Sequence, residues 1–246
     1  MQGMPGHSTR TFALSSQDAV FLDFDGTLAA LQDDANTVWL AEGMDAILEA
    51  CAKRLNGALA IISGRDLDDL FKRVPPTLWR FGNHGLRASG PGEHSADEIA
   101  AAPHGLTTAL AEIAAQLPGV HLETKGPVIA IHYRAAPTVE SELGLALRQA
   151  VLPFDDYSLQ HGKMVYEAKP TAANKGKCLS AAIQHKPFAG RRPVMIGDDT
   201  TDEDAFVAAQ SAGGIAVKIG EGATAAQHRM SSIEDVHALL KEFASV

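Results

Sequence analysis

The stretch AVFLDFDGT, residues 19–27, decides how the rest of the chain is interpreted. It begins with apolar residues suited to a β-strand covered on both faces, and it ends in two carboxylates and a glycine that permits a tight turn. Residues two apart in a strand point to the same side, so Asp23 and Asp25 are predicted to lie together. Such carboxylates repel unless a cation or a shared proton lies between them, which indicates a metal site or an acid–base pair. The alternative is an Asx turn that closes the strand, where Asp and Gly are common.

Length and charge bound the remaining possibilities. The 246 residues, of which 46% are hydrophobic, suit one large domain or a core domain with a smaller insert. The formal net charge of −9 argues against a surface that binds nucleic acid or anionic membranes. An anionic substrate would have to be attracted by a local patch or by a bound cation.

The cysteines and the first residues indicate the compartment. Cys51 and Cys178 give neither a disulfide framework nor the spacing of metal ligands, so a reducing compartment is expected. Residues 1–12 lack the apolar run of a signal peptide, and no apolar run approaches membrane-spanning length. We therefore expect a soluble, cytoplasmic protein.

A second strand with a polar end follows the first. Helical spacing over 38–55 leads into an apolar strand at 58–62, which ends in S-G-R at 63–65 before another helical pattern. Strands that alternate with helices pair in parallel, and their carboxyl ends meet at one sheet edge. The S-G-R turn is therefore predicted to open into the same crevice as Asp23 and Asp25. Taken alone, it is also typical of a helix start with a capping residue.

From residue 105 the rhythm changes to two helices and two hairpins, with turns at 125–127 and 161–163. This pattern predicts an antiparallel sheet with helices on one face. The residues expected to face the helices are Ile129, Ile131, Tyr133, Met164 and Tyr166. The residues expected on the opposite face are His132, Arg134, Lys163 and Glu167. That polar face suits either ordinary solvation or a site that holds many hydroxyl groups.

The alternation of strands and helices returns near residue 174. Asn174 is predicted to cap a helix whose first turn holds Lys175, a position where a cation opposes the helix dipole. Lys175 is therefore either exposed or kept to meet an anion. The strand at 193–196 then runs into GDDTTDEDAF, which could be a solvated, acidic helix start. Because it follows a strand, its carboxylates should reach the edge where Asp23 lies, where they are tolerable mainly beside a hard cation.

Taken in order, the loops D-F-D-G-T, S-G-R, N-K-G and G-D-D-T-T-D-E resemble the four motifs of the haloacid-dehalogenase-like (HAD) phosphohydrolase superfamily. The stretches GNHG, ETKG, IHYRAAP, GKMVYEAKP and GDDTTDE further resemble trehalose-6-phosphate phosphatases, and the likeness runs from about residue 19 to residue 223. The chain departs from that family at Leu86-Arg87, where an acidic residue is often found, and no role is carried to that position.

The resemblance implies an α/β fold with a doubly wound, mostly parallel sheet of the Rossmann type and an inserted α/β cap containing an antiparallel sheet. It places the catalytic core at residues 1–90 and 170–246, and the substrate-recognition cap at 91–169. This agrees with the change of rhythm that begins near residue 105.

The resemblance also implies a phosphoric monoester hydrolase. Asp23 would attack phosphorus to form an aspartyl phosphate, and Asp25 would act as general acid and base. Ser63 and Lys175 would hold the phosphoryl oxygens. Mg²⁺ would be held by Asp23, by the main-chain carbonyl of Asp25 and by Asp198, with Asp199 or Asp202 supporting from nearby. The residues expected to bind substrate are Ser63, Gly64, Arg65, Lys125, His132, Lys163 and Glu167.

The substrate implied is trehalose 6-phosphate, converted to trehalose and phosphate in the last step of trehalose biosynthesis, with a possible functional link to a trehalose-phosphate synthase. A sucrose-phosphate or mannosyl-phosphoglycerate phosphatase, or a hexose phosphomutase, would share the core and differ in the cap. A non-catalytic regulator that binds sugar phosphates is the alternative from another class. Neither a nucleic-acid nor a membrane partner is expected.

Overall fold

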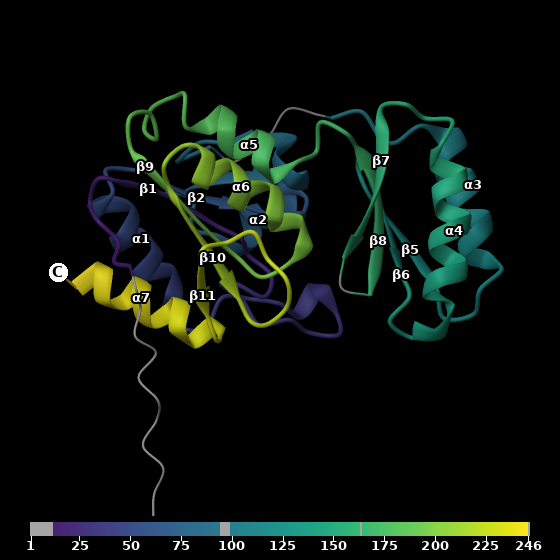
Figure 1. The fold of residues 1–246 in the computed structure, drawn as a ribbon, viewed down its shortest axis with the longest axis horizontal. Coiled ribbons are helices and arrows are strands. Elements are labelled where there is room, and N and C mark those ends of the chain that lie inside the picture. The colour runs from purple at the N-terminus through teal and green to yellow at the C-terminus, as the bar shows by residue number, and fades with distance from the viewer. Residues whose placement is uncertain (1–11, 94–98, 163, 246) are drawn as a thin grey trace, which may run out of the picture.

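The computed structural model of the protein describes residues 12–93, 99–162 and 164–245. Two β-sheets organise these residues, each with helices packed against it (Figure 1). We call the seven-stranded sheet the core sheet and the four-stranded sheet the cap sheet. Lys163, one of the predicted substrate-binding residues, lies outside the described residues. Among the described residues, no helix is long and apolar enough to cross a membrane.

The core sheet has the strand order β11-β10-β9-β1-β2-β3-β4, and only β4 runs antiparallel to its neighbour. Its strands are β1 (Asp18–Leu22), β2 (Leu59–Ile62), β3 (Trp79–Gly82), β4 (Arg87–Ser89), β9 (Arg192–Gly197), β10 (Ile215–Ile219) and β11 (His228–Met230). Every residue of β1 is buried, because this apolar strand lies in the middle of the sheet with both faces covered. The predicted central strand is thus confirmed.

Helices cover both faces of the core sheet, with α1 beside α7 and α5 beside α6 on the other side (Figure 1). The helices here are α1 (Met44–Arg54), α2 (Leu67–Arg73), α5 (Lys175–Ala182), α6 (Glu203–Ser211) and α7 (Ile233–Ser245), with the 3-10 turns η1 (Ala35–Thr37), η2 (Asn83–Gly85) and η4 (Thr200–Asp202). The predicted cap of α5 is present, because the side chain of Asn174 accepts a hydrogen bond from the Lys177 amide.

The cap sheet is antiparallel, with the order β5-β6-β8-β7. Its strands are β5 (His121–Lys125), β6 (Val128–His132), β7 (Tyr157–Gly162) and β8 (Val165–Pro170), and its helices are α3 (His104–Ala115), α4 (Glu140–Val151) and the 3-10 turn η3 (Pro137–Val139). Helices α3 and α4 lie on the side away from the core sheet (Figure 1). The predicted fold class, a doubly wound sheet with an inserted antiparallel cap, is confirmed.

The alternation within the cap is confirmed with one exception. Ile129, Ile131, Tyr133 and Tyr166 all belong to the buried cluster that α3 and α4 cover. Burial of each large apolar side chain contributes roughly 1.5–3 kcal/mol, which fixes the opposite face toward the core sheet. Met164 was expected in this cluster, and that prediction is wrong. It sits in the turn between β7 and β8 with a φ of 62°, so strand alternation does not govern it, and it lines a cavity on the opposite face.

Other differences concern where elements begin and end. Strand β1 ends at Leu22, so Asp23 and Asp25 lie in the turn that follows instead of alternating along the strand. Helix α1 begins at Met44 instead of near residue 38, because η1 and a left-handed Gly43 (φ 75°) precede it. Strands β3, β4 and β11 were not predicted; β4 and β11 have three residues each, too few for a periodicity to register.

Candidate active site

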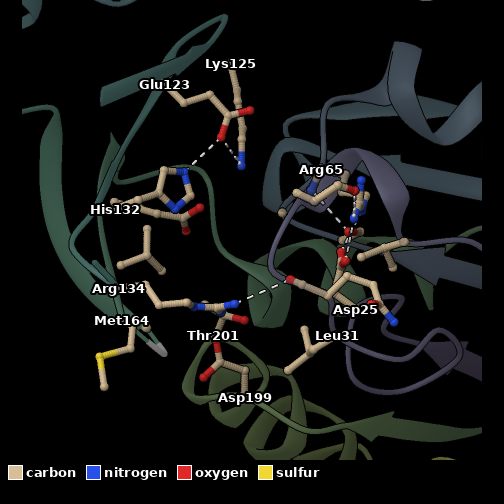
Figure 2. A pocket seen from close by; sticks show the side chains of 18 of the residues that line it. Asp25, Leu31, Arg65, Glu123, Lys125, His132, Arg134, Met164, Asp199 and Thr201 are labelled. Atoms are coloured by element: carbon tan, nitrogen blue, oxygen red, sulfur yellow. Dashed lines mark hydrogen bonds and ion pairs between the residues drawn. The ribbon is translucent and has the colours of Figure 1, made fainter. Parts of the chain in front are cut away.

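A cavity of about 890 Å³ lies between the carboxyl ends of the core strands and the polar face of the cap sheet. Figure 2 shows Asp25, Arg65 and Asp199 on the core side, opposite Lys125, His132 and Arg134 of the cap. The sequence-predicted residues that line it are Asp23, Asp25, Ser63, Gly64, Arg65, Lys125, His132, Glu167, Lys175, Asp198 and Asp199. Parallel strands end at one edge of the sheet, so loops distant in sequence meet there.

Lys175 connects two of the acidic loops. Its Nζ lies 2.7 Å from Asp23 Oδ1 and 2.7 Å from Asp202 Oδ1, and the lysine is only 3% exposed. Burial alone would lower the pKa of Lys175, but the two carboxylates outweigh it and raise that pKa above its ordinary value. Lys175 is therefore a buried cation held by two loops of the protein, not the exposed residue that the helix position also allowed.

Three carboxylates crowd around this lysine. One oxygen each from Asp23, Asp198 and Asp202 lie within 4.8 Å of one another. Burial raises the pKa of Asp23 well above its ordinary value; Lys175 partly opposes this rise, while Asp202 and Asp198 add to it. Burial, with Asp202 and Asp199 nearby, likewise raises the pKa of Asp198 to about 7. The raised pKa values of Asp23 and Asp198 show that their ionised forms are disfavoured here, and a cation that joins them would stabilise these forms.

The cluster fits a divalent cation in two further respects. Asp198 Oδ1 is buried and has no hydrogen-bond partner, so a ligand atom is left free. A Cβ on Gly26 would lie 2.2 Å from Asp198 Oδ2, and Gly26 has a φ of 81°, so only glycine lets the two loops approach this closely. Asp202 Oδ2 accepts hydrogen bonds of 3.1 Å from the amides of Asp198 and Asp199, which holds the loop in place.

Asp25 has different partners from Asp23. Both of its oxygens accept hydrogen bonds from Arg65, at 2.7 Å from Nε and 2.6 Å from Nη2. Arg65 also donates to Asp69 at 2.7 Å and to the carbonyl of Ala35 at 2.9 Å. Arg65 is thus a bidentate partner for Asp25, and the two side chains lie at the same cavity wall.

Two further core residues differ in their relation to the cavity: Ser63 lines it, and Arg87, where the chain departs from the family pattern, does not. Ser63 is 1% exposed, and its Oγ accepts a hydrogen bond of 3.1 Å from the Arg65 amide, so the hydroxyl hydrogen remains available to the cavity. Arg87 pairs with Asp66 at 3.0 Å and is not among the residues that line the cavity. The position where the chain departs from the resemblance is thus a core salt bridge.

Three further cavity residues have no role assigned from the sequence, Glu123 and Arg134 on the cap side and His84 on the core side. Glu123 Oε2 lies 2.9 Å from His132 Nε2 and 3.4 Å from Lys125 Nζ, as Figure 2 shows. The hydrogen bond from His132 lowers the pKa of Glu123, so this carboxylate is ionised at neutral pH. Arg134 and His84 also line the cavity. Alternation had placed Arg134 on the polar face, whereas Glu123 and His84 lie in the stretches ETKG and GNHG without a pattern that singles them out.

Comparisons with known proteins agree with one another. A family model described as trehalose-phosphatase matches residues 21–235. The chain is 38% identical over 241 residues to the trehalose-6-phosphate phosphatase of Escherichia coli, across 95% of this chain and 89% of that protein. It is also 38% identical over 225 residues to a probable trehalose-phosphate phosphatase of Sinorhizobium fredii, across 90% and 84% of the two chains.

Solved structures show the same fold. The C-terminal domain of the C. albicans trehalose-6-phosphate phosphatase superposes with a TM-score of 0.80 at 21% identity, across 95% of this chain and 98% of that one. A sugar phosphatase of HAD subclass IIB superposes with a TM-score of 0.61 at 16% identity, across 93% and 100% of the two chains. The architecture is therefore of the HAD type.

Proposed function

The chain belongs to the trehalose-phosphatase family, and from this premise we propose that it hydrolyses trehalose 6-phosphate to trehalose and phosphate. The observation that carries the proposal is the arrangement around Lys175, where the acidic loops meet at the core end of a cavity whose other wall is polar. Phosphoryl transfer depends mostly on positioning and on stabilising spread negative charge, and this site offers both.

Asp23 is the proposed nucleophile. Its carboxylate oxygen attacks phosphorus, the bond from phosphorus to the sugar oxygen breaks, and an aspartyl phosphate forms. The Lys175 ammonium, 2.7 Å away, favours the ionised carboxylate that attack requires, against the effect of burial. Water then attacks the phosphoryl group and releases phosphate, which regenerates Asp23.

Asp25 is the proposed general acid and base. It gives a proton to the leaving sugar oxygen and takes one from the attacking water, so the two steps leave its protonation unchanged. Because both oxygens accept hydrogen bonds from Arg65, Asp25 must first turn away from that guanidinium. Arg65 keeps Asp69 and the Ala35 carbonyl as partners, so it need not move with Asp25.

Mg²⁺ is the proposed cation. Asp23, the main-chain carbonyl of Asp25 and Asp198 would hold it, with Asp199 and Asp202 supporting. When bound, it would neutralise charge on the phosphoryl oxygens. Ser63 and Lys175 would bind the same oxygens from the protein, and Gly64 and Arg65 would contact the phosphate end of the substrate.

The sugar end is proposed to bind the cap. Lys125, His132 and Glu167 line the cavity from the cap sheet, as a site for sugar hydroxyls requires. Lys163 is proposed to bind the sugar on the basis of the sequence alone.

We propose residues 91–169 as the cap domain and residues 1–90 and 170–246 as the catalytic core. The free, buried thiols of Cys51 and Cys178 support a cytoplasmic enzyme, and a trehalose-phosphate synthase is the proposed source of its substrate.

The test is phosphate release from a panel of sugar phosphates, with Mg²⁺ and with EDTA. We expect trehalose 6-phosphate to be hydrolysed with the highest kcat/KM and only with Mg²⁺. Faster turnover of sucrose 6-phosphate or mannosyl-phosphoglycerate would move the assignment to another sugar phosphatase. Binding of the panel without any turnover would replace the enzyme with a regulator.

A further inference from the structure

The turn η2 holds two consecutive residues in the left-handed region, Asn83 with a φ of 51° and His84 with a φ of 56°. Such backbone costs of order 1–3 kcal/mol for each residue and persists only where the surroundings hold it. Here the Asn83 amide donates to Arg65 O at 2.7 Å, and the His84 amide donates to Ser63 O at 2.9 Å. The turn is therefore fixed to the loop that lines the phosphate end of the cavity.

Both side chains of this turn reach across to the cap. Asn83 Nδ2 donates to the main-chain carbonyl of Lys125 at 3.1 Å, and His84 Nε2 lies 2.8 Å from Glu167 Oε2. Asn83 is 0% exposed and His84 2% exposed, so both contacts are shielded from water. Two neighbouring residues of the core thus contact the first and third strands of the cap sheet, β5 and β8.

The chemistry of the second contact is a neutral imidazole beside a carboxylate. Burial, with Lys169 and Lys175 nearby, lowers the pKa of His84 although Glu167 opposes this. Burial alone would raise the pKa of Glu167, but His84, Lys125 and Lys169 outweigh it and lower that pKa well below its ordinary range. The two pKa shifts favour a neutral His84 beside an ionised Glu167, and the 2.8 Å separation brings Nε2 next to Oε2, although the Nε2–H is not aligned for a hydrogen bond in this structure.

The imidazole is also held from the core side. A Cβ on Gly64 would lie 2.7 Å from His84 Cε1 and 2.9 Å from Nε2. No side chain other than hydrogen fits between the S-G-R loop and the ring, so the ring rests directly on that loop. The position of Nε2 is therefore set by the backbone of residues 63–65.

We propose that His84 is a positioning residue that fixes the carboxylate of Glu167, and thereby sets the distance between the sugar-binding face of the cap and the phosphate-binding loop of the core. This inference rests on the proposed function, because Glu167 is the proposed partner of sugar hydroxyls. A carboxylate that His84 contacts through one oxygen keeps its remaining lone pairs for the sugar. His84 itself need not touch the substrate.

Two variants with opposite properties test the proposal. His84→Asn is well suited to left-handed backbone but too short to reach Glu167, whereas His84→Gln is less suited to that backbone but places an amide near the position of Nε2. With trehalose 6-phosphate, we expect His84→Asn to lose about tenfold in kcat/KM, mainly through KM, and His84→Gln to retain activity within about threefold of wild type. A residue needed only for its turn would give the reverse order, which overturns the proposal.

A double-mutant cycle adds an independent readout. If the two side chains act together, His84→Asn combined with Glu167→Gln should be no worse than Glu167→Gln alone, whereas losses that multiply overturn the coupling.

A spectroscopic measurement needs no substrate, and it tests the contact even if the His84 variants do not fold. In ¹⁵N spectra of the whole protein, the His84 imidazole should carry its proton on Nε2, and Glu167→Gln should shift that nitrogen. A proton on Nδ1, or a charged ring at neutral pH, contradicts the contact even if wild type hydrolyses trehalose 6-phosphate. Failure of wild type to do so contradicts the proposed function alone.

Discussion

At the scale of single residues, the site is governed by an excess of buried negative charge around one lysine. Asp23 and Lys175 are 4% and 3% exposed, and Asp202 is 0% exposed. Removing one partner of a buried ion pair normally costs about 3–5 kcal/mol, because the other charge is left without compensation. Asp23 is different, since Asp198 and Asp202 already disfavour its charge and Lys175 keeps Asp202 as a partner.

Asp23→Asn should therefore abolish turnover without unfolding the protein. We expect kcat/KM to fall by about three orders of magnitude or more, because the amide cannot attack phosphorus. The thermal melting temperature should stay near that of wild type. Asp155→Asn, in an exposed turn outside the cavity, is the matched control and should leave both quantities unchanged. Activity of Asp23→Asn within about tenfold of wild type would exclude the covalent mechanism.

Removal of metal should have an effect as large as loss of the nucleophile. Activity should vanish with EDTA and return with Mg²⁺, because the crowded carboxylates and the free Asp198 oxygen need a cation. Asp198→Asn should raise the Mg²⁺ concentration needed for half-maximal activity or eliminate turnover. Titration of activity with Mg²⁺ in both proteins makes the comparison. Hydrolysis that persists in EDTA would rule out the metal requirement.

At the scale of elements, strand β8 links the cap to the core and carries a half-buried carboxylate, Glu167, and a buried cation, Lys169. Lys169 is 6% exposed, and no hydrogen bond from its ammonium is found among the described residues. Burial lowers the pKa of Lys169 to about 8 from 10.5, with Glu167 opposing and Lys175 adding to the shift. Strand β8, which lines the cavity through Glu167, thus also contains the Lys169 cation, whose burial lowers the stability of the folded protein.

Lys169→Met should stabilise the protein at pH 7. Because the folded-state pKa of about 8 lies below the unfolded value of 10.5, the unfolded chain binds more protons between these values, and wild-type stability rises with pH across that window. Below pH 8 the full cost applies, and we expect the variant to gain about 1–3 kcal/mol in free energy of unfolding. This gain should shrink as the pH rises from 8 toward 10.5.

Urea unfolding at pH 7 and at pH 9.5 measures this effect. The matched control is Lys241→Met, which removes an exposed lysine of α7 and should change stability little at either pH. A Lys169→Met protein less stable than wild type at pH 7 would show that the attraction to Glu167 outweighs the cost of burial.

At the scale of the whole molecule, most of the site was predictable because it follows from sheet geometry. Parallel strands end at one edge, so the loops after β1, β2 and β9 had to meet, and with them Asp23, Ser63 and Asp198. Period-two alternation likewise placed His132 and Glu167 on one face of the cap sheet. These rules concern spacing along the chain, which a sequence displays directly.

What the sequence did not reveal depends on contacts between distant segments. The contact of His84 with Glu167 joins a turn of the core to a strand of the cap sheet, and the bidentate contact of Arg65 with Asp25 depends on a rotamer. His84 also follows a strand too short to show a period, and its left-handed backbone has no signature beyond the neighbouring glycines. Patterns that specify elements do not specify which side chains meet between them.

The proposed division of roles between the core and the cap gives a prediction for the whole molecule. Glu167→Ala should lower kcat/KM for trehalose 6-phosphate by roughly tenfold to a hundredfold, because a carboxylate that accepts hydrogen bonds from sugar hydroxyls contributes about 1.5–3 kcal/mol. A small aryl phosphate has no disaccharide for the cap to bind, while its phosphate still meets Asp23, Ser63 and Lys175, so its hydrolysis should fall by much less. Glu112→Ala, on the exposed side of α3, is the matched control and should affect neither substrate. If both substrates lose activity in equal proportion in Glu167→Ala, this carboxylate is structural or catalytic, and sugar recognition by the polar face of the cap sheet is wrong.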